Sequence, residues 1–180
     1  MSEKMEGSRK LNLGCGNQLL PGFVNLDIRK GHGIEVVHNL ERYPYPFKDN
    51  EFDFILASHV LEHLDDTVGV MAELHRILKP GGRLVIRFPY YQHPNAWLDP
   101  THKKCLTEET FRFFTLGFNK DRKIVNGRYT HNPVKGEHLF REMSYSYKPT
   151  WLGYIVYPFL RWLRHFCDIL ILEVEVRLVK

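Results

Sequence analysis

The sequence has few cysteines, no long hydrophobic run and no dense cluster of positive charge. Its three cysteines, at positions 15, 105 and 167 of 180, are too few and too scattered for a disulfide framework or a zinc knuckle. We therefore expect a reducing compartment, the cytoplasm. The net charge of +4 permits an anionic substrate, but without a basic stripe it argues against a nucleic-acid partner.

The first ten residues, MSEKMEGSRK, lack the apolar core of a signal peptide, and we expect residues 1–9 to form a disordered lead-in. Internal repeats and low-complexity segments are also absent. Hydrophobic residues make up 43% of the chain, which is enough for one globular domain with its own core. We place this single domain at residues 10–180.

A glycine turn between two short strands is the most informative feature. A strand expected at 11–13 breaks into Gly14-Cys15-Gly16, and a second strand at 23–26 ends on Asp27. Glycine lets a ligand approach the backbone closely, and a carboxylate after the neighbouring strand can accept hydrogen bonds from two ribose hydroxyls. The pattern indicates a nucleotide-type site, with an ordinary tight turn as the alternative.

Two details of this stretch narrow the possibilities. Leu19 stands where a dinucleotide fingerprint requires its third glycine, so a dinucleotide is disfavoured. Pro21 and Gly22 leave no room for a full helix before the second strand, and we expect at most one helical turn at 17–20.

Helices alternate with apolar strands along the rest of the chain. Further strands are expected at 34–38, 52–57, 83–88, 123–129 and 172–178. Helices are expected over 64–78, after a capping box that starts at Thr107, and within the aromatic segment 151–170; a loop is expected at 132–147. Such alternation predicts a parallel sheet with crossovers, whose ligands bind at the carboxyl ends of the strands.

The motifs LGCG, PFKDNEFD, LEH and RILKPGG occur together within residues 10–90. Their combination resembles the class I S-adenosylmethionine-dependent methyltransferases, in particular small members with a shortened segment between the glycine turn and the acidic residue. The resemblance implies an α/β, three-layer Rossmann-like sandwich around a mostly parallel sheet of seven or slightly fewer strands, with an antiparallel C-terminal strand. It implies S-adenosyl-L-methionine as cofactor, residues 10–90 as the cofactor half and 91–180 as the acceptor side.

The same resemblance assigns roles around the cofactor. The backbone of the glycine turn would approach the methionine part, Asp27 would hold the ribose, and residues 39–40 would flank the adenine. Asn12 and residues 58–59 would lie near the amino-acid end. The full set of expected cofactor residues is Asn12, Gly14, Cys15, Gly16, Asn17, Asp27, Asn39, Leu40, Ser58 and His59.

On the acceptor side, His102 or His131 could act as general base, because an imidazole titrates near neutral pH. Surface or packed histidines are the alternative. The aromatic and polar loop 90–102 leaves the fifth strand and is expected to shape the acceptor pocket. A small molecule or a saccharide precursor suits so compact a chain.

Potential metal ligands occur in two places. His59 and His63 are four residues apart but lack the H-E-x-x-H pattern, and residues 93–105 carry histidine, aspartate and cysteine at irregular spacing. For the first pair we favour His59 near the cofactor and His63 as a structural helix residue, and for the second set a loop with hydrogen-bonding histidines. We expect no metal.

Three charged residues, Arg161, Arg164 and Asp168, exclude a transmembrane helix in segment 151–170. A buried or homodimer-forming helix is preferred there over contact with a membrane surface. Two functional alternatives stay open. One is a non-catalytic cofactor-binding or scaffold protein of the same fold, and the other is a different nucleotide-using enzyme.

Overall fold

The computed structural model describes residues 7–116, 140–149 and 171–180. The strand expected at 123–129, the histidine at 131 and the segment 151–170 lie outside these residues. Within the described part of the chain, none of the helices has the length and apolar character that crossing a bilayer requires.

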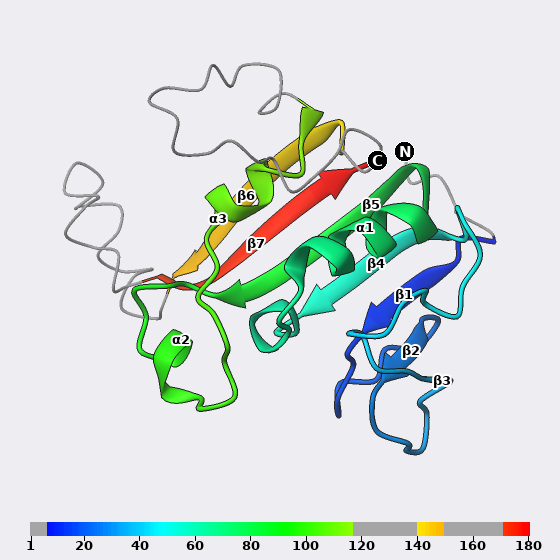
Figure 1. The fold of residues 1–180 in the computed structure, drawn as a ribbon, viewed down its shortest axis with the longest axis horizontal. Coiled ribbons are helices and arrows are strands. Elements are labelled where there is room, and N and C mark those ends of the chain that lie inside the picture. The colour runs from blue at the N-terminus through cyan, green and yellow to red at the C-terminus, as the bar shows by residue number, and fades with distance from the viewer. Residues whose placement is uncertain (1–6, 117–139, 150–170) are drawn as a thin grey trace.

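A seven-stranded sheet in the order β3-β2-β1-β4-β5-β7-β6 forms the centre of the molecule (Figure 1). The strands are β1 (Lys10–Leu13), β2 (Val24–Asp27), β3 (Val36–Val37), β4 (Phe52–Ser58), β5 (Leu78–Pro89), β6 (Glu142–Pro149) and β7 (Ile171–Val179). The first five pair in parallel, whereas β7 runs antiparallel to both β5 and β6. This confirms the mostly parallel sheet with an antiparallel C-terminal strand.

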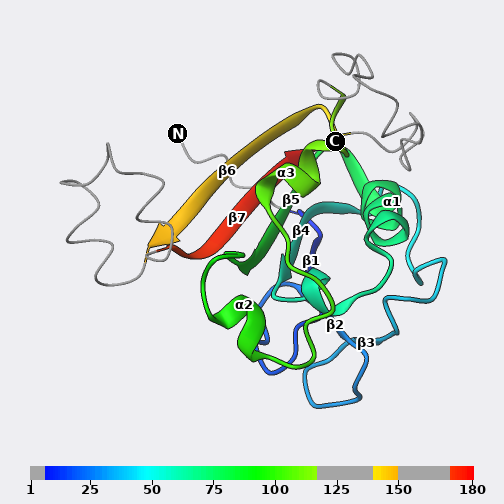
Figure 2. The ribbon, with the colours of Figure 1, turned by 60° about the vertical axis from the view of Figure 1, so that its left-hand side comes forward.

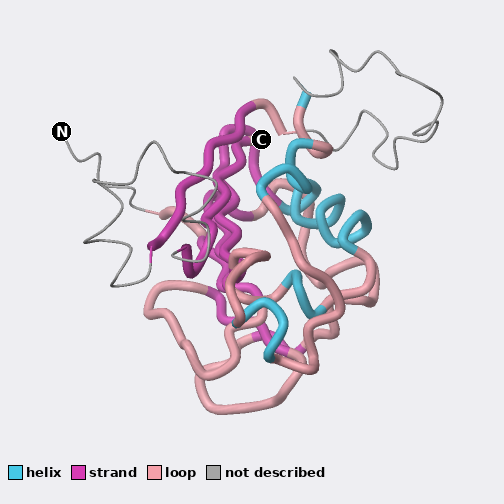
Figure 3. Tube along the Cα trace, turned by 90° about the vertical axis from the view of Figure 1, so that its left-hand side faces the viewer, coloured by secondary structure: helices cyan, strands magenta, loops and turns pink. Residues whose placement is uncertain are grey.

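The described helices cover one face of this sheet. They are α1 (Thr67–Ile77), α2 (Asn95–Leu98), α3 (Glu108–Arg112) and a 3₁₀ turn, η1 (Leu61–His63). Figure 3 shows the strands edge-on with α1 and α3 to one side, and Figure 2 shows α2 at the carboxyl end of β5, apart from α1. The described residues thus form two of the three expected layers.

Local sequence explains why α1 begins and packs where it does. The carboxylate of Asp66 accepts a hydrogen bond from the N–H of Gly69 and caps the first turn. Val70, Met71, Leu74 and Ile77 recur at helical spacing and are buried against the sheet. The capping box expected at Thr107 is confirmed at the start of α3.

Three boundaries differ from the expectations. Arg9, placed in the lead-in, is fixed beside the sheet, because its N–H donates to Oδ2 of Asp53 (2.8 Å) and its carbonyl accepts from the N–H of Asp53 (2.9 Å). Strand β5 begins at Leu78, since the chain returns to the sheet before the Gly81 turn instead of after it. The loop expected up to residue 147 is corrected by β6, whose alternating residues find their partners only on β7.

A pinned loop, rather than a helix, connects β1 to β2. The buried side chain of Asn12 donates to the carbonyl of Gln18 (2.8 Å) and to Oδ1 of Asn25 (2.9 Å). Asn25 in turn accepts from the N–H of Leu20 (3.0 Å) and donates to its carbonyl (3.3 Å). Two buried asparagines therefore satisfy the backbone groups that a crossover helix would satisfy internally.

We expect Asn25→Ala to lower the free energy of unfolding by about 1–3 kcal/mol, because it leaves the N–H of Leu20 and the amide of Asn12 without their buried acceptor. Urea unfolding measures the change. The matched control is Asn17→Ala in the same loop, whose exposed side chain predicts a change within about 0.5 kcal/mol. Equal effects of the two substitutions would contradict the pinning role.

Candidate functional site

The glycine turn after β1 is bent sharply against the entry to η1. Gly14 and Gly16 have φ values of +60° and +54°, in the left-handed region that favours glycine. A Cβ on Gly14 would lie 2.7 Å from Cγ2 of Val60, so a larger side chain would also clash at this position. Cys15 stands between these two glycines. Burial raises the pKa of its thiol, which argues against a nucleophilic thiolate at this position.

A cavity of about 390 Å³ opens beside this turn, at the carboxyl ends of β1, β4 and β5. Its lining combines the turn with side chains from the neighbouring strands: Asn12, Gly14, Cys15, Gly16, Asn17, Gln18, Leu20, Leu56, Ser58, His59 and Arg87. The structure therefore brings together seven of the ten expected cofactor residues, leaving out Asp27, Asn39 and Leu40. Residues that are far apart in the sequence meet here, because the carboxyl ends of parallel strands lie at the same edge of the sheet.

Most of the hydrogen-bonding capacity of the Asp27 carboxylate is already used within the protein. Oδ2 accepts from the N–H of Gly16 (2.8 Å), while Oδ1 accepts from the N–H (3.0 Å) and Nε (3.2 Å) of Arg29. Burial alone would raise the pKa of Asp27, but these hydrogen bonds outweigh it and hold the pKa below its usual value. The ionised group keeps one free lone pair on Oδ2, and a second if the 62% exposed Arg29 side chain withdraws.

The two residues expected beside an adenine do not line the cavity. Oδ1 of Asn39 accepts from the N–H of Glu41 (2.9 Å), which closes a local turn after β3. The side chain of Leu40 is buried in the core, and its carbonyl accepts from the hydroxyl of Tyr45 (2.9 Å). Their role at a base stays a prediction.

His59 is held between two carboxylates in an uncommon backbone conformation, with φ of +55°. Its Nε2 lies 2.9 Å from Oε2 of Glu173, and its Nδ1 lies 3.4 Å from Oε1 of Glu62. Glu173, followed by Glu62, raises the pKa of His59 to about 9, so the imidazole is a cation at neutral pH. His59 and Arg87 are the cationic side chains that line the cavity, and each is paired with a glutamate of β7.

Arg87 was not among the expected residues. It lies on β5, opposite Glu175 of β7, and its Nε donates to Oε2 of that glutamate (2.6 Å). The sequence did contain a signal for Arg87, which is the one charge inside the apolar run LVIRF. A central strand does not bury an arginine without a partner or a ligand, so this charge could have marked a site residue.

We expect the His59 imidazole to titrate near pH 9, and Glu173→Gln to move its pKa down towards the ordinary 6.5. Because the folded-state pKa is the raised one, the stability that the pair contributes is fully present below about pH 6.5 and is lost as the pH rises through 9. Imidazole NMR titration measures this. Glu175→Gln is the control, since Glu175 pairs with Arg87 instead; a wild-type value near 6.5 would contradict the assignment.

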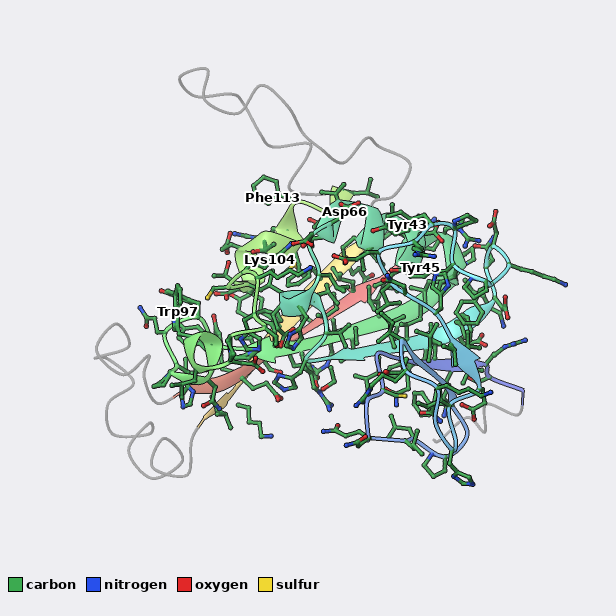
Figure 4. All side chains as sticks on the ribbon, turned by 60° about the horizontal axis from the view of Figure 1, so that its bottom comes forward. Tyr43, Tyr45, Asp66, Trp97, Lys104 and Phe113 are labelled. Carbon is green, nitrogen blue, oxygen red and sulfur yellow. The ribbon has the colours of Figure 1, made fainter. Side chains whose placement is uncertain are left out.

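A second cavity, of about 700 Å³, lies next to the first and shares His59 with it. It contains His102, the expected base, whose Nδ1 is hydrogen-bonded to the carbonyl of Ala96 (3.0 Å). The other candidate base, at position 131, falls outside the described residues. Trp97 is 70% exposed and donates to the carbonyl of Tyr91, at the α2 end of the molecule and away from Tyr43 (Figure 4).

The strand order, the glycine turn and the acidic residue after β2 define the fold of the class I S-adenosylmethionine-dependent methyltransferases. Residues 16–86 match the family model described as a methyltransferase domain, so the sequence of this part of the chain is similar to that family.

Three known proteins illustrate the likeness. A demethylmenaquinone methyltransferase of Staphylococcus saprophyticus is 41% identical over 54 residues, which are 30% of this chain and 23% of the relative. An Archaeoglobus fulgidus S-adenosylmethionine-dependent methyltransferase superposes over 97% of this chain and 87% of its own, with a TM-score of 0.68 and 18% identity. A Haemonchus contortus phosphoethanolamine N-methyltransferase in complex with S-adenosylhomocysteine has a TM-score of 0.55 and 14% identity, over 97% and 49% of the two chains.

Proposed function

We propose that this protein binds S-adenosylmethionine at the glycine turn and transfers its methyl group to a small acceptor. The observation that carries the proposal is the cavity beside residues 14–16, backed by the ionised Asp27 that is bonded to the N–H of Gly16. The family match of residues 16–86 supports it independently. Because the curated relative is matched over only 23% of its length, the activity is inferred for this chain and not transferred from that protein.

The residues present fit such a cofactor. The glycine turn exposes backbone to a ligand without a side chain in the way, and the free lone pair of Asp27 can accept a ribose hydroxyl. The cations His59 and Arg87 favour the carboxylate of an amino-acid end. S-adenosylmethionine, when bound, supplies an electrophilic methyl group on a sulfonium.

The chain itself then has mainly to position the partners. The second cavity adjoins the first at His59, so an acceptor held there would face the cofactor cavity. His102 lines this second cavity, where its imidazole can take up an acceptor's proton. A small molecule or saccharide precursor is the acceptor class that we propose.

Calorimetric titration with S-adenosylhomocysteine tests the cofactor, with a nicotinamide dinucleotide as the competing ligand. We expect micromolar binding of the first and none of the second. Transfer of a labelled methyl group to a panel of sugars, amines and phenols then tests turnover. Binding without transfer to any acceptor would favour the non-catalytic alternative, and preference for the dinucleotide would overturn the proposal.

A further inference from the structure

Three potential metal ligands from two distant parts of the chain lie together beside the second cavity, which His63 and His102 line. Glu62 and His63 belong to η1, and His102 comes from the loop after α2. One ligand atom from each lies within 4.8 Å of the other two. The rings of His63 and His102 meet edge to face, with centroids 4.7 Å apart.

The carboxylate of Glu62 is the unusual member of this group. Glu62 is 2% exposed, and neither of its oxygens has a hydrogen bond within the described part of the chain. Among the described residues, its ion-pair partner is the imidazole of His59, at 3.4 Å. A buried carboxylate is costly unless hydrogen bonds or a cation compensate it, so its position calls for a further positive partner.

The hydrogen bonds of the two histidines leave the same nitrogen available on each ring. Nδ1 of His102 faces the carbonyl of Ala96, which can only accept, so this nitrogen carries the proton. The Thr101 hydroxyl donates to Asp99 (2.6 Å) and therefore accepts from Nδ1 of His63 (3.0 Å). Both Nε2 atoms thus keep a lone pair, and an imidazole bonded in this way through its other nitrogen is the usual form of a metal ligand.

The two segments are tied together independently of any ligand. The N–H of Lys103 donates to the carbonyl of Glu62 (2.9 Å), and these two residues are the sequence neighbours of the two histidines. Nζ of Lys104 donates to the carbonyl of Asp65 (2.7 Å) and to the hydroxyl of Thr67 (2.8 Å). This holds the loop against the start of α1, where Figure 4 shows Lys104. The two segments that carry the ligands are therefore held together before a metal arrives.

We propose that Glu62, His63 and His102 bind a divalent transition-metal ion of the zinc or cobalt type. Two imidazoles and one carboxylate form the ligand set of open metal sites, whereas Mg²⁺ and Ca²⁺ prefer oxygen ligands. Bonds of about 2.1 Å require ligand atoms about 3.4 Å apart, so small side-chain rotations must draw the three together. This proposal departs from the expectation of no metal, which rested on sequence spacing, because the ligands converge in space and not along one helix.

The open side of this ion faces the second cavity, beside Asp99. If the proposed methyl transfer holds, an acceptor oxygen can occupy the open position, where a metal ion lowers the pKa of a bound hydroxyl. His102 then serves as a ligand in place of a general base. This step rests on the proposed function, whereas the metal site does not.

Titration of the chelator-treated full chain with Co²⁺, followed by visible absorption, tests the site. We expect one equivalent per chain and an affinity at least about tenfold lower in Glu62→Gln, His63→Ala and His102→Ala. His32→Ala, which removes an exposed histidine elsewhere, is the matched control and should bind as the wild type does. Mg²⁺ should not compete.

Thermal unfolding adds a readout that a merely structural role would not give. The melting temperature of the Glu62→Gln variant should not rise on addition of Zn²⁺, whereas that of the wild type should. Equal Co²⁺ binding by all variants, or no stoichiometric binding by the wild type, would overturn the site. Titration with S-adenosylhomocysteine in the same samples separates this failure from failure of the proposed function.

Discussion

Replacing Gly14 by alanine is expected to lower the free energy of unfolding by about 2–5 kcal/mol. A left-handed backbone at an L-residue contributes about 1–2 kcal/mol of this. The rest, about 1–3 kcal/mol, comes from overpacking, since the new Cβ would lie 2.7 Å from the side chain of Val60. Urea unfolding measures the loss, and cofactor titration should show that binding falls with it, because the turn must shift.

The chain offers a control that separates the two contributions. Gly22 has φ of +77° with nothing within 4 Å of its added Cβ, so Gly22→Ala carries the backbone strain alone, about 1–2 kcal/mol. In a double-mutant cycle, Val60→Ala should recover the overpacking part of Gly14→Ala but not the strain. Additive effects in that cycle would show that Gly14 is needed for its conformation only.

Asp27→Ala should weaken binding of S-adenosylhomocysteine by about 1.5–3 kcal/mol, which corresponds to roughly a 10- to 150-fold rise in Kd. The substitution removes the acceptor for a ribose hydroxyl and also frees the N–H of Gly16, so the glycine turn loses its support. Calorimetry measures the Kd, and urea unfolding reports separately on the turn. Unchanged affinity in a folded variant would exclude Asp27 as the ribose ligand.

Arg29→Ala is an informative comparison, because its expected effect on cofactor affinity is opposite to that of Asp27→Ala. Its guanidinium occupies Oδ1 of Asp27, which a second hydroxyl would need. Removing it should leave cofactor affinity unchanged or tighten it a few-fold, while the pKa of Asp27 rises towards its ordinary value. Weaker binding instead would mean that Arg29 itself contacts the ligand.

The parts of the molecule that follow from local sequence were predictable. The apolar runs of β4 and β5, the Asp66 cap and the capping box at Thr107 each depend on residues close in the chain. Strand β6 was not, because its polar and aromatic alternation becomes a strand only when β7 supplies an edge. The residues 143, 145 and 147 do alternate, so period-two spacing was the signal available.

In the candidate site too, the features set by local motifs were predictable and those set by distant contacts were not. The turn, Asp27 and the strand ends follow from the motif, but the covering of Asp27 by Arg29 depends on a side chain whose direction no pattern encodes. Arg87 lines the cavity through a cross-strand pair with β7, almost ninety residues away. The convergence of Glu62, His63 and His102 likewise needs the loop after α2 to fold back onto η1.

His59 forms a common wall of both cavities, and this has a thermodynamic consequence. Its charge depends on Glu62 and Glu173, so whatever engages Glu62 on one side alters the field that His59 presents on the other. Occupancy of the two cavities is then linked by a coupling free energy, and linkage requires that coupling to be reciprocal. Under the proposed function, a donor and an acceptor in these two cavities would therefore influence each other's binding through one imidazole.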